Sequence, residues 1–183
     1  TLLDQSIIDY RFIAGALLAG SVVGYFAATK VQMTSMPEMV AIFNGFGGIA
    51  SLLVGSAEYV VSSLNNPALM GAIYMTVLIG GLTFTGSLVA YGKLSEVISG
   101  KPFLYKGQQF VNAILLLAIL IVGINMLFIQ GMISPNQTLI LLITLSFLLG
   151  ILFVIPIGGA DMPVVIALLN SFSGLAACAA GFV

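Results

Sequence analysis

The sequence predicts an all-α integral membrane protein, a bundle of about six transmembrane helices. Sixty per cent of the 183 residues are apolar and only 6% are charged, whereas soluble domains carry about 25% charged residues. The mean hydropathy is +1.20, so we expect lipid to surround most of the surface. The apolar runs are continuous rather than alternating, which favours helices over a barrel.

Six apolar segments are long enough to cross a bilayer, whose core of roughly 30 Å requires about 20 helical residues. They cover residues 12–29, 38–62, 69–92, 109–130, 137–158 and 163–183. Pro37 and Pro163 stand at the first turn of two segments, where a missing N–H costs nothing. We interpret 1–183 as a single transmembrane domain. Because it begins with Thr1 and ends in an apolar run, we expect it to be part of a longer polypeptide.

The basic residues predict the orientation of the chain. Four of the five fall in the first and third loops, on one side of the membrane: Lys30, Lys93, Lys101 and Lys106. Arg11 lies opposite. Basic loops tend to stay in the cytoplasm, so we expect loops 30–37, 93–108 and 158–162 on the inner face and both ends outside.

A weak internal repeat relates the second and sixth helices. Residues 36–55 align with 162–181 without gaps; both begin with Met-Pro, and Asn44 corresponds to Asn170. Three predicted helices lie between the two copies, so the second and sixth helices run parallel. Both Asn residues then lie roughly 10 Å below the inner boundary. They could face a common cavity, or each could hydrogen-bond a neighbouring helix as structural glue.

Polar residues are costly in lipid and are therefore informative. Asn44, Ser51 and Glu58 are spaced by seven and form one stripe along the second helix. Glu58 is either a solvated helix end or the outer mouth of a hydrated path. Ser and Thr on the third helix often bond their own helix, but together they make a wettable face. Such a path would hold water, and water relays protons; its candidate residues are Asn44, Ser51, Glu58, Thr83, Ser87 and Asn170. We expect Asn44, Ser87 and Asn170 to point into the bundle interior, near one another, because burial in hydrocarbon without partners would cost too much.

No catalytic constellation is recognisable. The chain has no His and one Cys, Cys178. Its glycine-rich pieces lie inside apolar helices and do not fit a phosphate-binding loop. The net charge of −1 does not suggest nucleic acid as a partner. We therefore expect no catalytic, cofactor-binding or metal site in this chain.

Three signatures resemble one known family. They are Met33-Thr-Ser-Met-Pro-Glu-Met-Val-Ala-Ile42, Thr83-Phe-Thr-Gly-Ser-Leu-Val-Ala-Tyr-Gly-Lys-Leu94, and Gly158-Gly-Ala-Asp-Met-Pro-Val-Val165 with Leu169-Asn-Ser-Phe-Ser-Gly174. In this order and spacing the chain, from about Gly20 to Val183, resembles the beta-subunit membrane domain of proton-translocating NAD(P) transhydrogenase.

The resemblance implies a proton-translocating membrane domain. It would couple proton passage to hydride transfer between NAD(H) and NADP(H) in soluble domains that this chain lacks, so the chain alone should be inactive. The implied partners are the NADP(H)-binding domain, further transmembrane helices and an NAD(H)-binding alpha subunit, with the whole enzyme a homodimer. The implied location is the bacterial inner (cytoplasmic) membrane, or the mitochondrial inner membrane in a eukaryote.

By position, the resemblance assigns Ser87 and Asn170 to the proton path. Asn44 stands where many members have His, which disfavours a mechanism that needs an imidazole and leaves one that uses a chain of water molecules. Asp161 lies in the loop that faces the NADP(H)-binding domain.

We interpret this loop, with Gly158, Gly159 and Pro163, as the coupling loop. The two glycines would permit unusual backbone conformations, and Pro163 fixes the start of the sixth helix. Asp161 either carries the coupling charge or simply caps that helix.

Two other classes remain open from the residues. One is a small secondary transporter or channel with a polar site at mid-depth. The other is a purely structural membrane subunit. A nucleotide-binding domain encoded downstream would favour the transhydrogenase.

Overall fold

The computed structural model describes residues 10–62, 66–129 and 133–183, and within these ranges the fold is built from long helices. Their bounds are α1 (Arg11–Lys30), α2 (Met36–Val61), α3 (Pro67–Leu94), α4 (Gln108–Ile124), α5 (Pro135–Val154) and α6 (Met162–Ala180). A π-helical turn, η2 (Asn125–Ile129), extends α4. All six helices are long and apolar enough to cross a membrane, which confirms the predicted all-α membrane fold.

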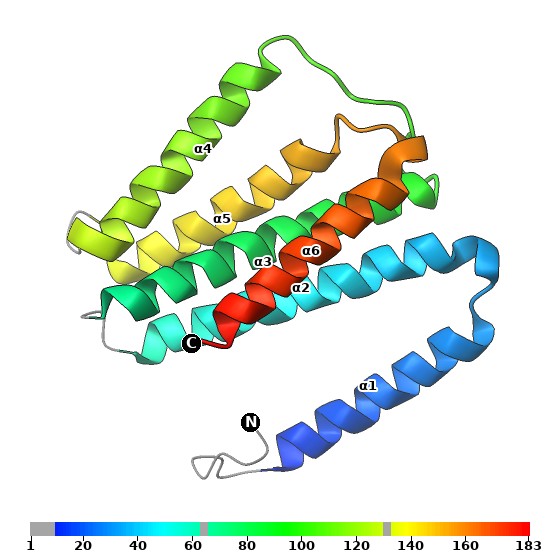
Figure 1. Ribbon diagram of the computed structural model, residues 1–183, viewed down its shortest axis with the longest axis horizontal. Coiled ribbons are helices and arrows are strands. Elements are labelled where there is room, and N and C mark those ends of the chain that lie inside the picture. The colour runs from blue at the N-terminus through cyan, green and yellow to red at the C-terminus, as the bar shows by residue number, and fades with distance from the viewer. Residues whose placement is uncertain (1–9, 63–65, 130–132) are drawn as a thin grey trace.

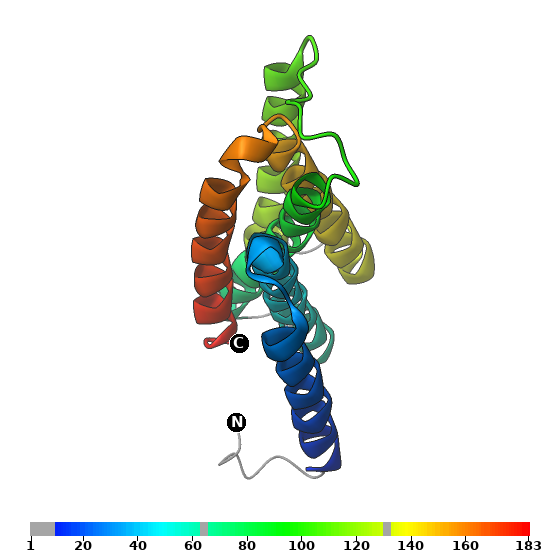
Figure 2. The same ribbon diagram turned by 90° about the vertical axis from the view of Figure 1, so that its right-hand side faces the viewer.

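Helix α3 is the centre of the bundle. It packs against α2, α5 and α6, and α4 packs against α5 on the far side (Figures 1 and 2). One apolar cluster joins α3 to α5 and α6 around Ala90, Val154 and Leu169. A second joins α2, α3 and α5 around Leu52, Ile73 and Leu142. Helix α1 lies apart from the other five and buries none of its residues.

The helix ends differ from the prediction where proline intervenes. Helix α5 ends at Val154 rather than at 158. Pro156 has no N–H with which to continue the helix. The segment 155–158 is apolar, so hydropathy alone had extended the prediction over it. Its carbonyl groups are left for partners outside α5.

The two copies of the repeat begin in the same way. A 3-10 turn, η1 (Met33–Ser35), leads into α2, and another, η3 (Gly159–Asp161), leads into α6. Ser35 has φ −95° and ψ 7°, and its counterpart Asp161 has φ −92° and ψ −2°. Figure 1 shows α2 and α6 running in the same direction, which confirms the parallel repeat.

The three loops predicted to share a membrane face lie at one end of the molecule. They connect α1 to α2, α3 to α4 and α5 to α6, and all are at the right of Figure 1. Which side of the membrane this end faces stays a prediction. We call it the inner end below.

Candidate functional site

A hydrogen-bonded cluster of three side chains joins α2, α3 and α6. The Asn44 amide donates through Nδ2 to Ser87 Oγ at 2.9 Å. Ser173 donates through Oγ to Asn44 Oδ1 at 2.8 Å. Asn44 is 7% exposed and Ser87 is fully buried. One amide therefore uses its donor on one neighbouring helix and its acceptor on another, which fixes its orientation.

Glycines bring these helices close enough for the cluster to form. A Cβ atom at Gly45 would lie 3.3 Å from Ser87 Cβ. At Gly48 it would lie 2.8 Å from the Gly80 carbonyl oxygen and 2.8 Å from Phe84 N, closer than real Cβ atoms come to backbone. Small residues at a helix crossing allow this approach in membranes. Helices α2 and α3 thus cross within one turn of Asn44.

The second Asn of the repeat lies at the rim of the same site. A groove of about 310 Å³ between α2 and α6 is lined by Val40, Phe43, Asn44, Gly47, Asn170 and Ser173. Asn44 and Asn170 therefore face a common groove. A shared cavity was one of the two interpretations that the sequence left open. The expectation that Asn170 points into the bundle interior is wrong, because its side chain is exposed. Helix α6 turns Leu169 toward the core, and the next residue lies about 100° around the helix.

The other predicted path residues occupy different surroundings. Ser51 is buried, but it donates to Gly47 O of its own helix at 3.1 Å. A hydroxyl bonded in this way has a structural role. Thr83 is fully buried one turn before Ser87, and within the described part of the chain its Oγ1 has no protein hydrogen-bond partner. Glu58 is half-buried in the last turn of α2. Only Asn44 and Ser87 of the predicted set are directly joined.

The predicted coupling loop lies at the inner end of the same helices. Asp161 is exposed at the N-cap position of α6, and its side chain makes no capping hydrogen bond. Pro163 stands in the first turn of α6, as expected.

The reason given for the loop glycines was wrong. Gly158 has an ordinary φ of −71°, and Gly159 does not adopt a positive φ either. A Cβ atom at Gly159 would lie 3.3 Å from Gly100 Cα, and Gly159 N donates to Gly100 O at 2.8 Å. Close contact between two loops, rather than backbone freedom, favours glycine at 159.

Two residues of this region were missed in the sequence. Ser173 follows Asn170 by three residues, and that spacing places both on one helix face. From the sequence, Lys93 serves only to predict the orientation of the chain in the membrane. In the structure its side chain is buried, with 3% of its surface exposed. A lysine within a signature that also carries Ser87 was the available clue.

The chemistry available at the cluster is neutral and hydrogen-bonding. Amide and hydroxyl groups donate hydrogen bonds to water and accept them from water, but they do not titrate near neutral pH. Among the described residues no group of His, Cys, Asp and Glu could hold a metal ion. The arrangement is suited to orienting water between helices.

Comparison with known proteins decides the family. A family model described as NAD(P) transhydrogenase beta subunit matches residues 1–183. The chain belongs to the NAD(P) transhydrogenase beta subunit family. It is 37% identical over 190 residues to the NAD(P) transhydrogenase subunit beta of Rhodospirillum rubrum, and equally similar to the sequence from a named strain of that species. The match covers 100% of this chain and 40% of each relative.

Proposed function

We propose that this chain forms the proton-conducting membrane part of an NAD(P) transhydrogenase. In the complete enzyme it couples proton passage to hydride transfer between NAD(H) and NADP(H), which bind to soluble domains outside this chain. The observation that carries the proposal is the Asn44–Ser87–Ser173 cluster, which opens onto the groove between α2 and α6 in a member of the beta subunit family.

The cluster would act by holding water in line rather than by taking up a proton itself. Asn44 cannot supply a titrating imidazole, but its fixed amide presents Ser87 and Ser173 in defined orientations. Among the residues that the structure describes, Thr83 Oγ1, one turn before Ser87 on α3, has no protein partner. Buried hydroxyls of this kind are satisfied by ordered water. Thr83 and Ser87 would therefore continue the path along α3, and Glu58 would form its outer mouth on α2, whereas Ser51 is left out because its own helix uses its hydroxyl.

Coupling would take place at the inner end. Asp161 is exposed and engaged in no cap, so its charge is available to an NADP(H)-binding domain. The remaining transmembrane helices and an NAD(H)-binding alpha subunit complete the assembly, which we propose is a homodimer. We place it in the bacterial inner membrane, or in the mitochondrial inner membrane of a eukaryote.

The test uses the complete enzyme in sealed vesicles that contain a pH-sensitive dye. Ser87→Ala removes the hydroxyl that accepts from Asn44, and Ser51→Ala is the matched control because that hydroxyl serves its own helix. We expect Ser87→Ala to slow nucleotide-driven proton movement about tenfold or more at equal protein abundance, because the roughly 10²–10⁴-fold contribution of groups that transfer a proton themselves is an upper bound for one that only orients water. Ser51→Ala should be near normal. Equal behaviour of the two variants would contradict the proposal, and proton movement without nucleotides would favour a channel.

A further inference from the structure

The lysine at the end of α3 is buried against the segment that joins α5 to α6. Lys93 donates through Nζ to Ile155 O and to Ile157 O, both at 2.6 Å. Three other lysines at the inner end are exposed: Lys30, Lys101 and Lys106. A charged amine is buried only where strong acceptors meet it. Lys93 is therefore part of the internal structure rather than of the solvated face.

The acceptors are two carbonyl groups just beyond the end of α5. Ile155 is the C-cap of α5, and Pro156 prevents the helix from continuing. A helix C-terminus carries partial negative charge, which an ammonium group complements. Ile155 O also accepts from Phe103 N at 3.3 Å, so the α3–α4 loop meets the same carbonyl.

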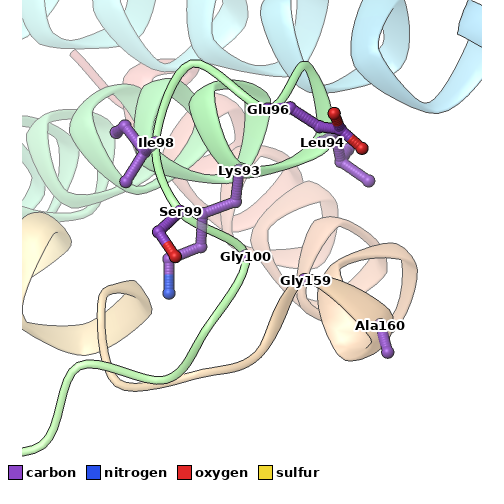
Figure 3. Close-up of a pocket in the computed structure, with 8 residues that line it drawn as sticks. All are labelled: Lys93, Leu94, Glu96, Ile98, Ser99, Gly100, Gly159 and Ala160. Carbon is purple, nitrogen blue, oxygen red and sulfur yellow. The ribbon is translucent and has the colours of Figure 1, made fainter.

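The two inner loops are joined at a second point. Gly159 N donates to Gly100 O at 2.8 Å. Figure 3 shows Lys93 extending from the end of α3 into the space between the loops, with Gly100 beside Gly159. A pocket of about 500 Å³ is lined there by Lys93, Glu96, Ser99, Gly100, Gly159 and Ala160, among others. The α3 end, residues 98–103 and residues 155–159 are thus held as one unit.

We propose that Lys93 is a positioning residue that links the coupling loop to the proton path through α3. The proposal rests on the proposed function. Asp161 lies two residues beyond the Gly159–Gly100 contact, and Ser87 lies six residues before Lys93 on the same helix. A displacement of the loop is transmitted through the Lys93 ammonium to α3, and so to the hydroxyl that holds Asn44.

The first test replaces the ammonium in the complete enzyme. Lys93→Met keeps the length and apolar stem of the side chain but removes both hydrogen bonds. Lys101→Met, in the same loop region and exposed, is the control. We expect Lys93→Met to lower the number of protons moved per hydride transferred about fivefold or more, the lower range of typical coupling between sites. A purely structural lysine would lower abundance and leave this ratio unchanged, which would overturn the proposal.

A cross-link gives a second test that does not depend on how well Lys93→Met folds. Cβ atoms at positions 100 and 159 would lie 3.9 Å and 3.3 Å from the opposite Cα atoms, so two cysteines placed there would be in contact. Gly100→Cys with Gly159→Cys is placed in Lys93→Met, with Cys178→Ser to remove the exposed native thiol. Oxidation should restore most of the lost number of protons moved per hydride transferred, and reduction should abolish this rescue. Absence of rescue by the formed disulfide would show that holding the loops is not what Lys93 does.

The two proposals fail in different ways. If Ser87→Ala also leaves proton movement normal, the proton path itself is misplaced. If Ser87→Ala impairs proton movement while Lys93→Met has a normal ratio, only the link through α3 is refuted.

Discussion

Helices α2 and α6 start from the same sequence and the same backbone turn, yet they bury opposite faces. Ala41 and Asn44 of α2 are buried, and so is Gly48. Their counterparts in α6, Ala167, Asn170 and Gly174, are all exposed. Conversely Met162 is fully buried, whereas Met36 is 43% exposed. The repeat preserves where each helix begins but not how it is rotated against the bundle.

The partner helix explains the difference. Helix α2 crosses α3 through glycines, so the face of α2 that carries small residues must turn inward. Helix α6 meets α3 through Val165, Ile166 and Leu169, and this larger apolar face displaces the glycine face outward. The consequence is functional: one amide of the repeat is fixed inside the bundle and the other stands at the rim of the groove.

The largest effect on stability is expected at the glycine pair. Gly48→Ala places a Cβ atom 2.8 Å from Gly80 O and from Phe84 N, and only separation of α2 from α3 relieves that contact. We expect a loss of about 1–3 kcal/mol or more in unfolding free energy. Gly174→Ala meets nothing within 4 Å and should be neutral or slightly stabilising. Thermal unfolding of the detergent-solubilised enzyme measures both effects. Equal losses of stability in the two variants would contradict the predicted difference between α2 and α6.

A smaller effect on stability is expected at the two Asn residues. Asn44→Leu leaves the buried Ser87 hydroxyl without its donor and Ser173 without its acceptor, which should cost about 1–3 kcal/mol. Asn170→Leu changes an exposed side chain and should cost less than about 0.5 kcal/mol. The same unfolding measurement compares them. Greater destabilisation by Asn170→Leu would show that α6 is rotated in the complete enzyme.

The smallest effect is expected at the helix starts. Neither Ser35 nor Asp161 makes a side-chain capping bond, so Ser35→Asn and Asp161→Asn should each change stability by less than about 0.5 kcal/mol. Their functional effects should differ, because only Asp161 lies in the coupling loop. Proton-coupled hydride transfer should fall in Asp161→Asn alone. Normal activity of that variant would exclude its charge from the coupling.

The sequence predicted the parts of this fold that depend on one helix at a time. Apolar length located all six helices, and Pro37 and Pro163 placed two helix starts. Polarity in lipid identified Asn44 and Ser87 before any contact was known. The burial of Lys93 and the exposure of Asn170 could not be predicted, because both depend on the rotation and position of a second helix. Lys93 needs the end of α5 beside it, and Asn170 depends on which residues of α6 face α3.

The central question is whether the exposed amide, Asn170, serves the same proton path as the buried amide, Asn44. The most direct measurement is nucleotide-driven proton movement by the complete enzyme in vesicles, compared between Asn170→Leu and Ser171→Leu. Ser171 is the adjacent exposed polar residue, it bonds its own helix, and it does not line the groove. We expect Asn170→Leu to slow proton movement about tenfold or more at normal abundance and thermal stability, with Ser171→Leu near normal. Normal proton movement in Asn170→Leu would contradict the shared path.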